Sequence, residues 1–135
     1  MRGVNLAEVM VRDETMAGRA LDTWILPDLP DQITARELLR LRVREEVARF
    51  HATAGDVFHG LVRPVAARET PAGFTVRPGQ RLDWVAQADA ACAAFARNGF
   101  VMIVGPRQVD DLDQLIDLRR DPTVAFIRLV PLVGG

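Results

Sequence analysis

Two short runs near the N-terminus have the mainly apolar, β-prone composition of strands, and the first alternates only weakly between apolar and polar positions. They are Leu6 to Val11 and Ala20 to Leu26. The side chains of the second run divide over two faces, with Leu21, Thr23 and Ile25 on one and Trp24 and Leu26 on the other. Between the runs, Glu14 to Gly18 predicts a turn in which Gly18 has a positive φ. We therefore expect a hairpin, with its second strand ended by Pro27 to Pro30.

A helical pattern follows from Thr34 to about His51. Thr34 is a candidate N-cap and Glu37, at the third helical position, completes a capping box. The apolar residues at helical spacing predict an inward stripe: Ala35, Leu39, Val43, Val47 and Phe50.

Charged residues lie between the apolar positions of this helix. Two pairs spaced four apart, Arg42 with Glu46 and Glu45 with Arg49, are expected on outer faces, each contributing a few tenths of a kcal/mol. A row of arginines also shares one side: Arg36, Arg40 and Arg44. This row is either a solvated face or a docking surface for a partner.

The middle of the chain has weaker signals. Residues from Ala52 to Gln80 contain several prolines and glycines and predict an irregular excursion with a small hairpin. A second helix is expected from Asp83, its N-cap, to a cap at Asn98-Gly99. Its inward stripe would comprise Trp84, Ala88, Ala91 and Phe95.

The C-terminal part returns to strand patterns. Phe100 to Val104 is a continuous apolar run, and Gly105 to Gln108 is a turn. Asp111 to Leu118 predicts a short helical or 3₁₀ turn. Val124 to Val130 predicts a last strand. Strands, a helix, an excursion with a second helix, and further strands together indicate an α+β fold.

This last apolar segment leads directly into Gly134-Gly135. Glycine permits the closest approach of a backbone to its surroundings, so a di-glycine tail can enter a narrow channel. We therefore expect the α-carboxylate of Gly135 to be a reactive group that the rest of the chain presents. On this view no protease need expose it.

The order of parts from Phe100 to Gly135 resembles that of ubiquitin-like proteins. The shared parts are a strand, a glycine turn, a run here reading Gln108-Val109-Asp110-Asp111, a short apolar helix, and a strand that enters the di-glycine. The resemblance implies a β-grasp fold, in which a mixed sheet packs on a central helix. Residues 1–135 would form one domain, with an insertion at about 52–98 that carries an extra helix before the third strand, and a flexible tail at about 131–135.

The resemblance also implies a function. In ubiquitin-like modifiers an ATP-dependent adenylating enzyme activates the terminal carboxylate, and a conjugating enzyme joins it to a target protein. Gly134 and Gly135 would carry the chemistry, and the recognition residues would be Leu129, Pro131, Leu132 and Val133, with Arg36, Arg40 and Arg44 as a further contact. The chain would hold no catalytic residue and no cofactor, because the partner binds ATP.

Two alternatives remain open. The stretch from Val124 to Gly135 is also similar to the ending of sulfur carriers in molybdopterin and thiamine synthesis, which would make Gly135 a thiocarboxylate. Where ubiquitin has arginines before the di-glycine, this chain has Leu132 and Val133. In the other alternative the chain is a β-grasp adaptor that binds a partner without conjugation.

Composition narrows the choice of partners and location. The net charge is −1 with acidic and basic residues interspersed, so no basic stripe for nucleic acid is present. The N-terminus lacks a signal-peptide layout and no apolar run is long enough to span a membrane. With a single cysteine, Cys92, the chain has no internal disulfide. We expect a cytoplasmic protein that does not bind membranes.

Other candidate chemistry is weak. Cys92 is expected inside the second helix as a small hydrophobic residue, and His51 and His59 lack further ligands at metal-binding spacing. The acidic residues Asp110, Asp111, Asp113 and Asp117 read as a solvated face rather than a calcium loop. All 17 basic residues are arginine. Without lysine, chains linked through lysine are impossible, and we expect attachment as a single tag, or through threonine hydroxyls or the N-terminus if chains form.

Overall fold

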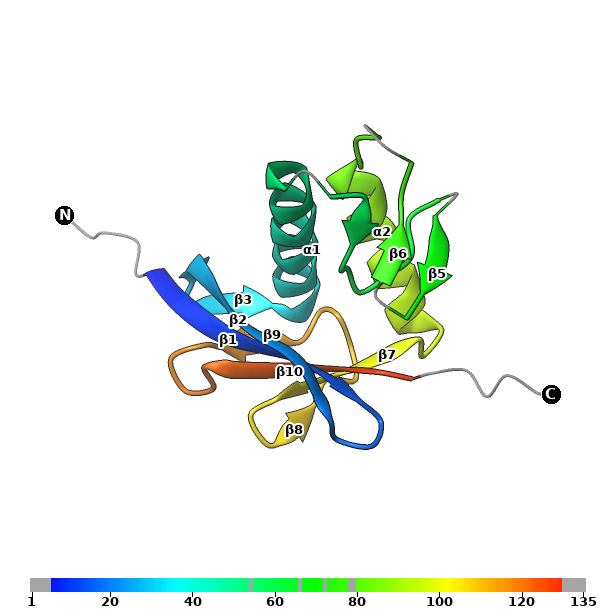
Figure 1. Cartoon of the computed structure of the whole chain (residues 1–135). Helices are drawn as coiled ribbons and strands as arrows, with labels where there is room; N and C mark the ends of the chain where they lie inside the picture. Colours follow the sequence, from blue (N-terminus) through cyan, green and yellow to red (C-terminus); the bar gives the residue numbers. More distant parts are fainter. Residues whose placement is uncertain (1–5, 54, 66, 72, 78–79, 130–135) are drawn as a thin grey trace. The chain divides into compact units, whose positions relative to one another are not determined.

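The computed structural model describes residues 6–129 apart from 54, 66, 72 and 78–79 (Figure 1). It confirms an α+β protein with a mixed sheet and two helices. By its contacts the chain divides into two compact units. The first unit comprises the residues up to Leu38 and from Phe95 onward, and the second comprises Leu39–Ala94. The expected insertion at 52–98 lies mostly in the second unit, and each unit is described by itself.

The first unit is built on a five-stranded sheet with the order β2-β1-β10-β7-β8. Its strands are β1 (Leu6–Thr15), β2 (Ala20–Pro30), β7 (Phe100–Val104), β8 (Arg107–Gln108) and β10 (Thr123–Arg128). β1 and β10 run parallel, whereas the other neighbouring pairs are antiparallel. The last strand therefore lies inside the sheet, between the first strand and β7 (Figure 1).

The N-terminal hairpin is confirmed, including the positive φ of 81° at Gly18. The prediction that the second strand ends at Pro27 is wrong, because β2 continues to Pro30. The register shifts where Val9 pairs with Leu26 but Ala7 pairs with Leu29. This bulge takes up the extra residues, one of which, Asp28, has a φ of 61°. Since β2 is an edge strand, its prolines remove no hydrogen bond from an inner ladder.

One face of this sheet forms the core of the first unit. Its buried side chains alternate along the strands, as the period of two requires: Val9 and Val11, Trp24 and Leu26, Met102 and Val104, and Val124 and Phe126. The Phe100 ring contacts Phe95 and Phe126, with centroids 5.9 Å and 6.2 Å apart. The predicted strand Phe100 to Val104 is confirmed. The last strand ends at Arg128, and Val130 lies outside the described residues.

The predicted helical turn from Asp111 to Leu118 is wrong in its second half. A turn closes where the Gln114 N–H donates to the Asp111 carbonyl, at 3.0 Å, and the chain then forms strand β9 (Leu115–Asp117). β9 pairs antiparallel with β3 (Gln32–Thr34). Ile116 and Leu118 are buried while Leu115 and Asp117 are exposed, so the local period is two rather than 3.6.

Both helices are confirmed with their predicted caps. They are α1 (Ala35–Ala52) and α2 (Trp84–Ala96). The Glu37 N–H donates to Thr34 Oγ1 at 3.1 Å, and the Val85 N–H donates to Asp83 Oδ1 at 3.0 Å. Asn98, in the predicted C-cap of α2, has a φ of 60°. The excursion of the second unit forms a three-stranded antiparallel sheet, which contains β4 (Val57–Phe58), β5 (Arg68–Thr70) and β6 (Gly73–Thr75).

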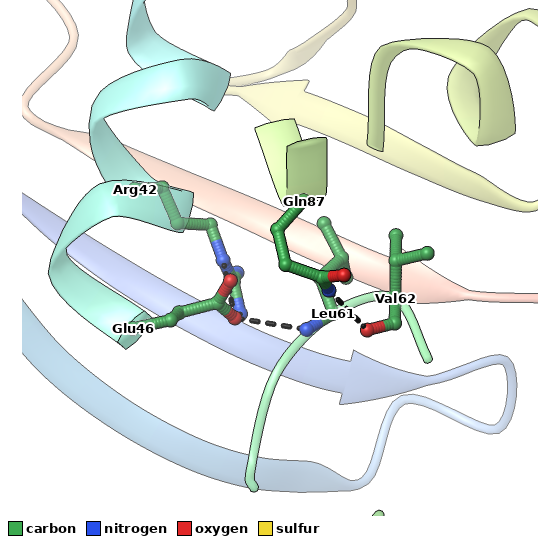
Figure 2. Close-up of polar contacts among 5 residues, drawn as sticks. All are labelled: Arg42, Glu46, Leu61, Val62 and Gln87. Atoms are coloured by element: carbon green, nitrogen blue, oxygen red, sulfur yellow. Dashed lines mark hydrogen bonds and ion pairs between the residues drawn. The ribbon is translucent and has the colours of Figure 1, made fainter. Parts of the chain in front are cut away.

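The inward stripe of α1 contains an ion pair that sequence patterning placed on an outer face. Arg42 is 1% exposed and Glu46 is 7% exposed, and Arg42 donates to Glu46 Oε2 at 2.9 Å. The same oxygen accepts the Leu61 N–H at 2.8 Å, and the Gln87 side-chain amide donates to the Val62 carbonyl at 3.0 Å (Figure 2). Side chains of α1 and α2 thus satisfy the backbone of residues 61–62, and this loop covers the pair.

Candidate functional site

The reactive end predicted from the sequence lies at the limit of the described chain. Leu129 is half-buried, and its N–H donates to the Gly99 carbonyl at 3.2 Å. Four of the predicted site positions, together with Gly135, lie outside the described residues: Pro131, Leu132, Val133 and Gly134. The chain therefore leaves the sheet beside the start of β7.

The exit of β10 is held from both sides. Ile127 pairs with Glu14 of β1 and with Val101 of β7. Arg128 pairs in the same way with Thr15 and Phe100. A strand with two neighbours has its backbone groups satisfied on both edges, so its direction at Leu129 is fixed by the sheet.

The sheet face opposite the core is accessible and mixed, with the Arg12–Glu14 ion pair on strand β1 and apolar residues on the strands to either side. We call it the open sheet face, and its apolar residues are Met10, Leu21, Ile25, Val101, Ile103, Ala125 and Ile127. The register joins them: Met10 pairs with Ile25, and Ala125 with Ile103. Met10 and Ile25 are 41% and 44% exposed. Exposed apolar patches of this kind mark interaction surfaces.

Ile127 and Val101 connect the open sheet face to the exit of the chain, because they pair two residues before Leu129. A partner bound on this face would therefore lie beside Leu129, the last described residue. The sequence of β2 predicted which of its residues lie on each face of the sheet. It could not show that β1, β7 and β10 add apolar residues to the open sheet face, because this depends on the order of the strands in the sheet.

The three arginines proposed as a docking row do not share one environment: Arg36 pairs with Asp113, whereas Arg40 and Arg44 both lie near the Trp84 ring. Arg36, in the first unit, donates to Asp113 at 3.1 Å. In the second unit Arg40 donates to Asp89 at 3.0 Å, and its guanidinium lies 5.6 Å from the Trp84 ring centroid. Arg44 is exposed and its guanidinium lies 5.8 Å from the same centroid. Surface ion pairs such as that of Arg36 contribute at most about 1 kcal/mol.

The second unit also has a cavity that sequence reasoning missed. It has a volume of about 350 Å³, and its lining residues are Arg44, Val47, Ala48, His51, Arg81, Leu82, Asp83 and Trp84. A second cavity of about 220 Å³ is also bordered by His51 and Arg81. The lining combines residues from α1 with the segment before α2, so no local motif signals it.

His51 is fixed at the cavity wall. Its Nε2 accepts the Leu82 N–H at 2.9 Å, which leaves Nδ1 to carry the proton of the neutral ring. Burial lowers the pKa of His51 below 6.5, and the positive charge of Arg81 lowers it further. The histidine is therefore neutral at physiological pH.

The remaining candidate residues, as far as the structure describes them, do not form a metal-binding group. Cys92 is half-buried on α2, and Asp110, Asp111, Asp113 and Asp117 are exposed. Within the described ranges, no group of three or more His, Cys, Asp or Glu side chains could hold a metal ion. Neither helix, over its described residues, has the length and apolar character needed to cross a membrane.

No family model, curated protein or solved structure matches this chain. Its function is therefore argued from its own residues and geometry.

Proposed function

We propose that the first unit is a β-grasp sheet of the ubiquitin-like kind. The support is its element order: a hairpin, a helix, and then strands that return to the same sheet. The last strand enters beside the first and parallel to it, which joins the two ends of the chain into one sheet. The expected insertion at about 52–98 lies mostly in the second unit, which also contains α1 from Leu39 onward.

On this fold we propose that the chain is a protein modifier whose Gly135 carboxylate is activated and joined to a target. The observation that carries the proposal is the place of β10, held between two strands and followed by residues 130–135 with their di-glycine. An interior strand gives the tail a rigid base, and the glycines give it little width.

The proposed reaction begins with two steps. A carboxylate oxygen of Gly135 attacks the α-phosphorus of ATP, and pyrophosphate leaves to give an acyl adenylate. A partner thiol or a target amine then attacks the carbonyl carbon, the amine or thiol proton passes to a base, and AMP leaves. When the nucleophile is the thiol, a further step follows, in which the target amine attacks the thioester carbonyl and the thiol leaves. The partner supplies ATP and the nucleophile, so this chain contributes only the carboxylate and the surface by which it is recognised.

We propose that recognition uses the open sheet face together with Leu129, Pro131, Leu132 and Val133. The support is that Ile127, on the open sheet face, lies two residues before Leu129. The arginines Arg36, Arg40 and Arg44 would contribute further contacts.

Pyrophosphate exchange tests the proposal. An adenylating enzyme encoded beside the gene should return labelled pyrophosphate to ATP only when the chain is present. Deleting Gly134-Gly135, or adding one alanine after Gly135, should abolish exchange. The control Gln32→Ala, an exposed change on β3 and outside the five-stranded sheet, should leave the rate unchanged. Exchange that survives the deletion would contradict the proposal.

The open sheet face also supports a second candidate, an adaptor that binds a partner without conjugation. Ile25→Asp would place a charge beside Met10 on that face and abolish binding of such a partner. In the adaptor the deletion of Gly134-Gly135 would leave binding intact, whereas in a modifier both changes would stop conjugation.

A further inference from the structure

The cavity of the second unit gathers positive charge. Together with the adjoining cavity, its described lining carries three guanidinium groups, from Arg44, Arg77 and Arg81, and one carboxylate, from Asp83. The carboxylate is engaged at the start of α2, where Asp83 Oδ1 accepts the Val85 N–H at 3.0 Å. The two linings together therefore have two positive charges in excess, and the larger cavity alone, with Arg44 and Arg81 against Asp83, has one.

These arginines differ from their neighbour Arg40 in their partners. Arg40 and Arg44 both lie over the Trp84 ring, but only Arg40 is paired with a carboxylate, Asp89, at 3.0 Å. Among the residues that the structure describes, no ion pair joins Arg44, Arg77 or Arg81 to an acidic side chain. The Trp84 ring orients the Arg44 guanidinium at the cavity without neutralising it.

The rest of the lining suits the organic part of a ligand. Val47 and Leu82 are buried apolar residues, and Ala48 adds a methyl group. His51 is held by the Leu82 N–H, so its Nδ1–H is the ring's remaining donor. A volume of about 350 Å³ accommodates a small molecule with a ring-sized body.

We propose that this cavity binds a small phosphate ester, with the phosphate between the Arg44 and Arg81 guanidiniums and the apolar part against Val47, Ala48 and Leu82. A phosphate monoester carries nearly two negative charges at neutral pH, which matches the excess positive charge of the two linings together. Guanidinium groups bind phosphate oxygens in a bidentate manner, which favours arginine for this task. The site is independent of the C-terminal carboxylate and goes beyond the proposed modifier function.

The test uses phenyl phosphate and the fluorescence of Trp84. A Trp24→Phe background leaves Trp84 as the single reporter, because the chain has two tryptophans. We expect a saturable change in emission, and an affinity about tenfold weaker in Arg81→Gln and in Arg44→Gln, the loss of one charged hydrogen bond. The matched control is Arg68→Gln, an exposed arginine of β5 that does not line the cavity.

Two further ligands and an NMR titration of His51 complete the test. Benzyl alcohol should not bind, and benzoate should bind more weakly than phenyl phosphate. Phenyl phosphate should also raise the pKa of His51, measured by NMR titration of the ring. Equal binding of benzoate would overturn the phosphate assignment. No saturation, or an equal loss in the control variant, would overturn the site, and thermal unfolding of each variant verifies that it is folded.

Discussion

Glu46 is a buried carboxylate whose hydrogen bonds connect α1 with the loop at Leu61. It is buried with Arg42, and one of its oxygens accepts hydrogen bonds from both Arg42 and the Leu61 backbone. A four-residue spacing of opposite charges on a helix usually indicates an exposed pair, which is why the sequence misplaced this one. Burial makes the pair costly to break rather than strongly stabilising as such.

Replacing Glu46 by Gln keeps its shape and removes the charge of the carboxylate that Arg42 donates to in the buried pair. We expect the free energy of unfolding to fall by about 3 to 5 kcal/mol, measured by urea denaturation. The control Glu45→Gln changes the neighbouring half-exposed residue and should cost less than about 0.5 kcal/mol. Similar losses for both variants would contradict the role of the buried pair.

His51 should make stability depend on pH. Its pKa in the folded chain lies below the ordinary 6.5, so the unfolded chain binds the proton first as the pH falls. The stability that depends on neutral His51 is therefore complete above pH 6.5 and is lost as the pH falls through the lowered pKa. Urea midpoints between about pH 7.5 and about pH 5.5 should decrease less in His51→Gln than in the wild type. His59→Gln, a change of the exposed second histidine, should behave as the wild type does.

Two glycines allow the cost of backbone strain to be measured apart from the cost of a steric clash. Gly18 and Gly105 have φ values of 81° and 56°, but a Cβ at Gly18 would meet no atom within 4 Å, whereas at Gly105 it would lie 2.6 Å from Asp121 Oδ1. Gly18→Ala should cost about 1 kcal/mol of unfolding free energy. Gly105→Ala should cost at least about 1 kcal/mol more, because Asp121 is buried and paired with Arg107. Equal losses in thermal or urea unfolding would show that the Asp121 contact is unimportant.

At the scale of elements, the sequence predicted those whose signals are local. Thr34 and Asp83 cap their helices through hydrogen bonds to nearby N–H groups, and the apolar run Phe100 to Val104 forms a strand. The errors arose where distant partners decide. Residues Leu115–Asp117 become a strand because Gln32–Thr34 pairs with them, which no local window can show.

The strand assignment of β9 predicts opposite sensitivities at adjacent residues. Ile116 is 3% exposed and Leu115 is 62% exposed. Ile116→Ala should lower the free energy of unfolding by about 2 to 5 kcal/mol, and Leu115→Ala by less than about 0.5 kcal/mol, measured by urea denaturation. Comparable losses at both positions would contradict the alternation that a strand requires.

At the scale of the whole molecule, the sequence and the structure contribute different parts of the candidate site. The di-glycine and the residues before it were found from the sequence alone, because they were recognised as an apolar strand segment followed directly by two glycines. The open sheet face could not be found in this way, since it collects residues from four strands whose neighbours are set by topology. The cavity of the second unit was missed for the same reason.

The most direct test of the modifier function is a search for its covalent products in cells that make a tagged form of the chain. Arg128 is the last basic residue, so trypsin would leave Leu129 to Gly135 attached to the modified target. After purification under denaturing conditions and digestion, we predict target lysines that carry this heptapeptide in an isopeptide bond, and none when Gly134-Gly135 is deleted. Recovery of the chain without any such branched peptide, or with an intact mass that shows a terminal thiocarboxylate instead, would contradict conjugation.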